Sequence, residues 1–217
     1  MIVVLASASS GRLSVLRAAG IEPVVLVAGI DEDAVRAAHL GREPGSVVQA
    51  IAQAKADAAV RNHAADPALA ESVVISGDSM LLLDGELQGK PHTRDEMLRR
   101  WEQQMGRTGE LITGHAVLRV EAGRVIAQAA GHAGAMVTMG RPSRAELEAY
   151  ADTGEPLEVA GAFTIDGLGG WFVESIDGDP SCVVGFCLPL VRRLLAEVGI
   201  TVTDLWNRER AGSAVQP

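Results

Sequence analysis

The sequence of 217 residues lacks features that would each indicate a particular class of protein. No apolar run reaches the roughly 18 residues that a membrane-spanning helix needs. The formal net charge is −9, which argues against nucleic-acid polymers and anionic membranes as partners, because both favour a basic surface. The two cysteines, Cys182 and Cys187, form neither a disulfide framework nor a metal-ligand spacing, so we expect them to be core residues in a reducing cytoplasm.

Lysine is also scarce. Of the 19 Lys and Arg residues, only Lys55 and Lys90 are lysines. Two interpretations are open at this point. The two lysines are accidental in an arginine-rich composition, or each occupies a place where arginine would not serve. An acidic protein can still bind a small anionic substrate if basic residues are concentrated at the binding site or if a divalent cation bridges protein and substrate.

Several familiar catalytic motifs are missing. The sequence has no GxxxxGK[ST] phosphate loop and no HExxH zinc motif, and it gives no support to a Ser-His-Asp or Cys-His arrangement. The histidines show no ligand-like clustering, and we assign no role to any of them: His39, His63, His92, His115 and His132.

Strand-like and helix-like segments alternate along the chain and predict a mixed α/β fold. We expect strands over 2–6, 24–27, 73–75, 80–83, 110–121, 124–138 and 171–176. We expect helices after Arg12 up to Gly20 and over 46–61, 93–105, 143–152 and 188–198, two of which open with a capping box. The start, MIVVLASAS, lacks the basic region of a signal peptide and is interpreted as a buried strand. The length fits one domain over 1–206, whose sheet can be subdivided, followed by a frayed tail over 207–217.

The first candidate site is the opening loop, LASASSGR, between the first strand and the first helix. Free backbone N–H groups and the helix dipole favour an anion at such a turn, and Arg12 can grip phosphate oxygens. Ser7 and Ser9 would add hydroxyl donors. Serines before a helix are equally typical of ordinary caps, so both interpretations remain open.

Three further candidates carry charge in unusual places. Lys55 lies on the apolar side of its predicted helix, where it must snorkel to solvent or meet a negative partner. Asp78 lies in a short polar segment between two apolar runs. A buried carboxylate there needs a cation, a metal or N–H donors as partners. The alternative is a structural aspartate in a turn or bulge. Lys90 precedes Pro91, which biases it to an extended conformation, although a solvated loop lysine fits equally. Asp31 and Glu32 belong to an acidic turn that could bind Mg²⁺ or be merely solvated.

Taken together, these segments resemble the Maf family of nucleotide pyrophosphatases. The block from Ser7 to Arg12 is similar to that family's S-x-S-x-x-R loop, and Ala54-Lys55-Ala56 matches its lysine motif. The central GDSMLLLDGELQGKP resembles its G-x-D segment running to G-K-P. The segment EPLEVAGAFTIDGLGGWFVESIDGD is similar to its last block. The blocks appear in the family's order over about residues 5 to 191.

The resemblance implies a Maf/ITPase-like fold, an elongated mixed sheet flanked by helices with a deep cleft, commonly in a homodimer. It implies a hydrolase acting on acid anhydrides that uses Mg²⁺ or Mn²⁺ to cleave a nucleoside triphosphate between its α- and β-phosphates. Asp78 would then be the general base and would also touch the metal, with Asp31 or Glu32 as further metal ligands. Arg12, Lys55 and Lys90 would hold the triphosphate, with Ser7 and Ser9 positioning its oxygens. Their match to family positions disfavours the view that the two lysines are accidental.

Three positions depart from the residues that select the base in relatives acting on dTTP and UTP: Gly11, Ser79 and Asp166. A carboxylate at 166 could accept hydrogen bonds from N1–H and N2–H₂ of a guanine, as the branch acting on 7-methyl-GTP suggests by carrying an acid there. Yet that branch has glutamine where Ser79 stands, so the chain falls between the two specificities. The alternative is a nucleotide-binding regulator of cell division with weak or lost catalysis.

Overall fold

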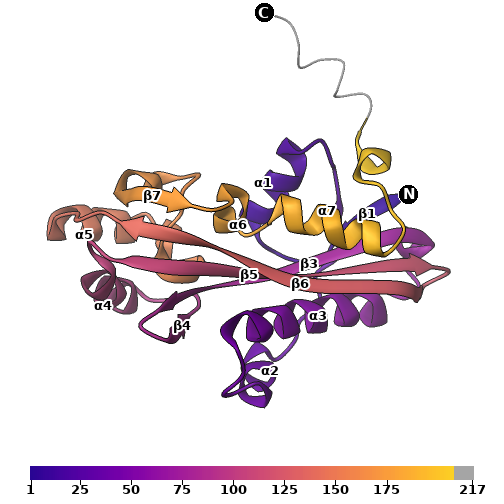
Figure 1. Cartoon of the computed structure of the whole chain (residues 1–217), viewed down its shortest axis with the longest axis horizontal. Coiled ribbons are helices and arrows are strands. Elements are labelled where there is room, and N and C mark those ends of the chain that lie inside the picture. The colour runs from indigo at the N-terminus through magenta and orange to yellow at the C-terminus, as the bar shows by residue number, and fades with distance from the viewer. Residues whose placement is uncertain (208–217) are drawn as a thin grey trace, which may run out of the picture. The chain divides into compact units, whose positions relative to one another are not determined.

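The computed structural model describes residues 1–207, and its strands form one mixed sheet (Figure 1). The order within the described residues is β2-β1-β3-β5-β6-β7, with β4 paired to β3. β1 runs parallel to β2 and β3, whereas the β3–β4 and β6–β7 pairs are antiparallel. This confirms the mixed α/β prediction. The strands are β1 (Ile2–Leu5), β2 (Val24–Val25), β3 (Glu71–Leu83), β4 (Glu86–Gln88), β5 (Thr108–Glu121), β6 (Arg124–Met139) and β7 (Val173–Asp177).

The chain divides into two compact units, each assembled from separate segments. The first unit comprises Met1–Asp78, Gly114–His132 and the segment from Leu188 onward, and the second comprises Ser79–Thr113 and Ala133–Cys187. Three of the four boundaries fall inside β3, β5 and β6, and the fourth lies between Cys187 and Leu188, directly before the last α-helix of the described residues. The organisation as one domain over 1–206 stays a prediction. The expected frayed tail lies, from residue 208 onward, outside the described residues.

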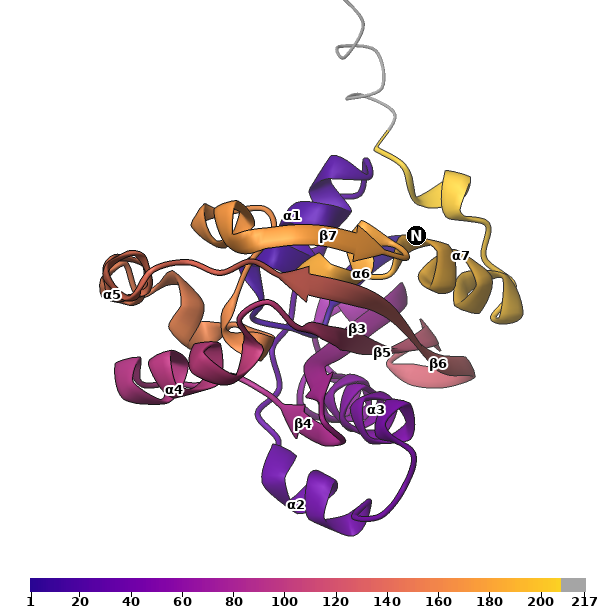
Figure 2. The same cartoon turned by 60° about the vertical axis from the view of Figure 1, so that its left-hand side comes forward.

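The first unit places helices on both faces of its strands. α1 and α7 lie over one face and α3 lies over the other (Figures 1 and 2). Small residues of α3, such as Ala56 and Ala59, share a buried cluster with Val4, Val74 and Leu118 of the strands, so the helix can approach the sheet closely. The helices are α1 (Ser10–Ala18), α2 (Glu32–Ala38), α3 (Pro44–Asn62) and α7 (Leu188–Glu197), with short 3₁₀ turns η1 (Pro67–Leu69) and η5 (Val202–Leu205).

The second unit packs its helices around a buried tryptophan. The Nε1 of Trp101 donates to the carbonyl of Ala162 at 2.8 Å, and its ring meets Phe172 edge to face at a centroid distance of 6.1 Å. The partnered indole nitrogen makes full burial of this side chain tolerable. The elements are α4 (Arg94–Gln104), α5 (Arg144–Asp152), α6 (Pro180–Val184), η2 (Glu155–Glu158), η3 (Ala160–Ala162) and η4 (Leu168–Phe172).

Local signals in the sequence placed several elements correctly. Asp84 and Gly85 form the turn between β3 and β4, and both have the positive φ that this tight hairpin requires. Ser143 opens α5 with a complete capping box. At Thr93 only half of the expected box forms, because the Glu96 carboxylate binds Arg99 and Arg100 instead of the backbone.

The two strands expected over 73–75 and 80–83 are a single strand, β3, that runs through the polar segment. No turn separates them, because polar side chains of this stretch have partners within the fold. Ser76 Oγ donates to the carbonyl of Ala52 at 2.6 Å, and Asp78 pairs with Lys55 at 2.7 Å. Asp78 therefore lies within a buried strand.

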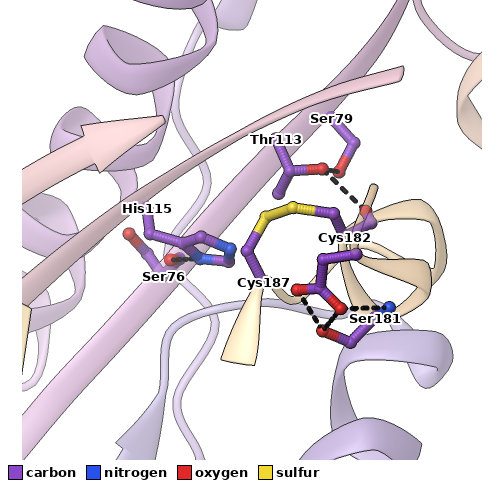
Figure 3. Close-up of a disulfide and its surroundings, with 8 residues drawn as sticks. Ser76, Ser79, Thr113, His115, Ser181, Cys182 and Cys187 are labelled. Atoms are coloured by element: carbon purple, nitrogen blue, oxygen red, sulfur yellow. Dashed lines mark hydrogen bonds between the residues drawn. A yellow bond between two sulfur atoms is a disulfide. The ribbon is translucent and has the colours of Figure 1, made fainter. Parts of the chain in front are cut away.

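The two cysteines are buried, as expected, but they form a disulfide, which the sequence analysis did not anticipate (Figure 3). Gly185 lies between Cys182 and Cys187 with φ 106°, and this left-handed residue reverses the chain after α6. The reversal brings two cysteines only five positions apart into bonding range. Thr113 Oγ1 donates to the carbonyl of Cys182 at 3.0 Å and lies 2.9 Å from Ser79 Oγ.

Candidate functional site

The opening loop serves as a helix cap and also fixes an arginine. Ser9 is the N-cap of α1, and its Oγ accepts from the backbone N–H of Arg12 at 3.3 Å. Ser7 Oγ accepts from the Ser9 N–H at 3.2 Å and from the Arg12 guanidinium at 3.0 Å. The capping interpretation is therefore correct for Ser9, whereas Ser7 orients the guanidinium. Gly11 lies in the first turn of the same helix.

Arg12 is a buried cation beside strand β3. A Cβ added at Gly77 would lie 2.9 Å from Arg12 Nε, so the strand admits the guanidinium only because residue 77 has no side chain. Burial lowers the pKa of Arg12, while Asp78 and Glu32 act to raise it. An arginine remains charged under these conditions, and the cluster thus contains a buried positive charge.

Lys55 connects two carboxylates that come from different elements. Its Nζ lies 2.7 Å from Asp78 Oδ1 on β3 and 2.8 Å from Glu32 Oε1 at the start of α2. Only 15% of the Lys55 side chain is exposed, so the lysine meets negative partners and does not snorkel. Of the two possibilities left open for Lys55, pairing with a negative partner is therefore correct.

Asp78 has one carboxylate oxygen in use and one without a partner. Oδ1 accepts from Lys55, whereas Oδ2 is buried and accepts no hydrogen bond from any described residue. Burial raises the pKa of Asp78, against the opposing effects of Lys55 and Arg12. A carboxyl group with a raised pKa and a vacant oxygen is suited to receiving a proton or to binding a further group.

His115 belongs to the same cluster, although the sequence analysis gave it no role. It is fully buried on β5, and its Nδ1 lies 3.0 Å from the carbonyl of Ser76, to which it must donate. Burial lowers the pKa of His115 to about 3, so the ring is neutral at physiological pH. Its place in the buried stretch 111–118 of β5, directly after Thr113-Gly114, is the signal that could have singled it out.

The remaining predicted residues lie elsewhere. Asp31 caps α2, with Oδ1 accepting from the Ala34 N–H at 2.9 Å. Lys90 belongs to the second unit, where its Nζ lies 3.4 Å from Glu158 Oε2 on the surface. Ser79 and Asp166 also belong to the second unit, and Asp166 is exposed. The first unit thus brings together Ser7, Ser9, Arg12, Glu32, Lys55 and Asp78.

A divalent cation is chemically compatible with this cluster. Among the described residues no group of three His, Cys, Asp or Glu side chains is arranged to hold a metal. The unpartnered Oδ2 of Asp78 and the carboxylate of Glu32 nevertheless offer the hard oxygen donors that Mg²⁺ prefers. Such ions are commonly bound by one or two carboxylates together with substrate phosphates, so two protein carboxylates suffice.

A comparison with protein-family models identifies the family, and the named relatives are similar over nearly the whole chain. The family model described as Maf-like protein matches residues 2–198. A protein of Rhodococcus erythropolis named nucleoside triphosphate pyrophosphatase is 54% identical over 95% of this chain and 97% of its own length. A protein of Rhodococcus jostii with the same name is 56% identical over 94% and 95%. Among solved structures, the Staphylococcus aureus Ham1 protein matches at 14% identity and a TM-score of 0.41, covering 95% of this chain and 94% of that one.

Proposed function

The chain belongs to the Maf family, and on this premise we propose that it is a nucleoside triphosphate pyrophosphatase. In the proposed reaction a water molecule attacks the α-phosphorus, the α–β phosphoanhydride breaks, and nucleoside monophosphate and pyrophosphate are released. The names of relatives above 50% identity, which this chain covers almost fully, support this assignment. No helix within residues 1–207 is long and apolar enough to cross a membrane.

The observation that carries the mechanism is the vacant oxygen of Asp78. Oδ1 is fixed by Lys55 while Oδ2 has no partner, so the carboxylate is held in place with one basic oxygen free. We assign Asp78 as the general base that takes a proton from the attacking water. Its raised pKa brings its basicity closer to that needed near neutral pH.

The cations of the cluster are assigned to the triphosphate. Arg12 and Lys55 carry buried or nearly buried positive charge, which offsets negative charge developing on the leaving pyrophosphate. Ser7 and Ser9 would position phosphate oxygens. Lys90 is assigned to the triphosphate as well, because it stands at the lysine of the family's G-K-P motif. Its exposed ammonium lies 3.4 Å from Glu158 Oε2, and a phosphate group could replace this surface carboxylate as its partner.

Glu32, Asp78 and Asp31 are assigned as residues that hold a divalent cation, Mg²⁺ or Mn²⁺. Such a cation, when bound, neutralises phosphate charge and polarises phosphoryl oxygens. Lys55 links Glu32 to Asp78 and therefore keeps these two carboxylates close together despite their mutual repulsion.

Base selection is assigned to the positions that depart from the pattern of relatives acting on dTTP and UTP: Gly11, Ser79 and Asp166. The exposed carboxylate of Asp166 can accept from N1–H and N2–H₂ of a guanine-like base. A guanine-like or modified triphosphate is therefore the proposed substrate. A homodimer and a cytoplasmic location remain predictions.

The proposal is tested by pyrophosphate release from a panel of standard, methylated and oxidised triphosphates, with Mg²⁺ and Mn²⁺ compared. Asp78→Asn should lower kcat by about 10²- to 10⁴-fold, which is the usual contribution of a general base. The matched control is Asp57→Asn on α3, whose carboxylate accepts from Gln53 Nε2 at 3.1 Å, and it should retain turnover. Tight nucleotide binding by the wild type without pyrophosphate release would instead favour the regulator of cell division.

A further inference from the structure

In the second unit, the glycine-containing loop 164–169 is held by hydrogen bonds to the carboxylate of Glu155. Glu155, the first residue of η2, accepts at Oε1 from Thr164 Oγ1 at 2.6 Å and from the Tyr150 hydroxyl at 3.1 Å. The backbone N–H of Gly169 donates to Oε1 at 3.1 Å, and that of Leu168 donates to Oε2 at 3.1 Å. Four donors, two of them from the loop backbone, thus converge on a single side chain that lies nine or more positions away from the loop.

The loop fits this carboxylate so closely that side chains are excluded. A Cβ at Gly167 would lie 2.8 Å from both oxygens of Glu155, and a Cβ at Gly169 would lie 2.4 Å from the Tyr150 hydroxyl. Glycine at these two positions therefore allows the backbone to close around Glu155. Residues 164–169 form a segment shaped by the carboxylate, and Asp166 lies in the middle of it.

The surroundings of Glu155 and Tyr150 keep the carboxylate ionised and the phenol protonated. Partial burial acts to raise the pKa of Glu155, but the hydrogen bonds from Thr164, Leu168 and Gly169 outweigh it and hold the pKa below its usual value. Burial raises the pKa of Tyr150, so its hydroxyl remains a donor. An ionised carboxylate can accept all four hydrogen bonds, whereas an amide can accept at one atom only.

We propose that Glu155 is a positioning residue that fixes the 164–169 loop and thereby holds Asp166 in the orientation that reads the base. This inference rests on the proposed function, in which Asp166 selects a guanine-like base. Glu155 itself does not contact the substrate in this scheme. Its contribution is to reduce the number of orientations that the Asp166 carboxylate would otherwise sample, which is the general effect of pre-organising a binding group.

The test compares kcat and KM for GTP and ATP in the wild type, Glu155→Gln, Asp166→Asn and the double variant. Glu155→Gln is isosteric but leaves at least one loop donor facing an NH₂ group. We expect it to raise KM for GTP about tenfold, because a loop donor loses its acceptor and the loop is held less firmly, with little change in kcat or in KM for ATP. Asp166→Asn should lower the GTP preference in the same way, and the double variant should add little further.

The matched control is Glu146→Gln, because Glu146 is also a hydrogen-bonded carboxylate of the second unit, binding Ser143 N at 2.6 Å in a capping box. It should reduce stability without changing the GTP to ATP ratio. If Glu155→Gln folds poorly, Thr164→Val removes the hydroxyl that donates to Glu155 and accepts from the Gly169 N–H, and it should shift the ratio in the same direction, while Thr164→Ser keeps that hydroxyl and should retain the wild-type ratio. Hydrogen exchange at the Leu168 and Gly169 amides should be faster in Glu155→Gln whatever the substrate.

The outcomes separate two failures. If the wild type releases no pyrophosphate from any triphosphate, the proposed function is overturned, and this inference with it. If turnover is normal but Asp166→Asn changes no ratio, Asp166 reads no base, so the inference and the assignment of base selection to Asp166 are overturned while the pyrophosphatase activity stands. The inference is equally overturned if Glu155→Gln lowers kcat for GTP and ATP alike, or leaves amide exchange at Leu168 and Gly169 unchanged.

Discussion

Replacing Lys55 with methionine should reveal how strongly the candidate site is held together. The substitution keeps most of the apolar stem but removes the ammonium that lies 2.7 Å from Asp78 Oδ1 and 2.8 Å from Glu32 Oε1. The two partners respond differently. The Glu32 side chain is 45% exposed and regains hydration, whereas the Asp78 side chain is only 9% exposed and cannot.

The expected cost therefore comes mainly from Asp78. Removing one partner of a buried ion pair costs about 3 to 5 kcal/mol, whereas an exposed pair contributes roughly 0 to 1 kcal/mol. We expect Lys55→Met to lower the free energy of unfolding by about 3 kcal/mol at pH 7. Asp78→Asn should cost only about 1 kcal/mol, because Lys55 keeps Glu32. The double variant should resemble Asp78→Asn, which corresponds to a coupling energy of about 3 kcal/mol between the two positions.

The sign of the pH dependence follows from burial. Burial raises the folded-state pKa of Asp78, so between the unfolded and folded pKa values the folded state binds more protons, and stability falls as pH rises through this window. Without Lys55 that pKa rises further, so the deficit of Lys55→Met should be smaller at pH 5.5 than at pH 8. Urea unfolding followed by circular dichroism and by tryptophan fluorescence measures both effects where the two transitions coincide. A loss below 1 kcal/mol, or a double variant as unstable as the sum of the single variants, would refute the reasoning.

His115 and the disulfide give further predictions. The unfolded chain protonates His115 near its usual pKa of 6.5, but the folded chain does so only at about 3, so stability should fall as pH drops below 6.5. His115→Asn keeps a donor for the Ser76 carbonyl and should reduce that slope by about 1.4 kcal/mol per pH unit in urea titrations, whereas an unchanged slope would contradict a buried neutral ring. A thiol reductant should lower the stability of the wild type by about 2 kcal/mol, as expected for opening a short loop. It should have no effect on a variant with Cys182→Ala and Cys187→Ala, and equal sensitivity of the two proteins would contradict the pairing.

Local chemistry made much of the fold predictable. Capping serines, the Asp84-Gly85 turn and long apolar periodicities act over a few residues, so they can be interpreted without knowing the rest of the chain. The continuity of β3 could not be predicted, because Ser76 and Asp78 are tolerated inside a buried strand only through partners contributed by α3. The short helix α6 depends in the same way on tertiary context, since the chain reversal at Gly185 and the disulfide follow it directly.

Several residues of the cluster in the first unit could be predicted from the sequence, whereas His115 and the pairings between the side chains could not. Lys55 stood out on the apolar side of its predicted helix, Asp78 in a polar segment between two apolar runs, and Arg12 in the loop before the first predicted helix. The sequence did not indicate that Lys55 would bind Glu32 and Asp78 together, nor that Arg12 would lie against Gly77. Glu155 was part of a matched motif, but its hydrogen bonds to a loop nine or more residues away could be found only in three dimensions.

The segmented make-up of the two units has a consequence for biosynthesis. The first unit starts at the N-terminus but is completed only by the segment from Leu188, whereas the second unit ends at Cys187. As the chain leaves the ribosome, the second unit is therefore complete while the first still awaits α7. Until α7 has been synthesised, the first unit exposes strand surface that this helix later covers (Figure 1), so the emergence of α7 determines when that surface is protected from aggregation.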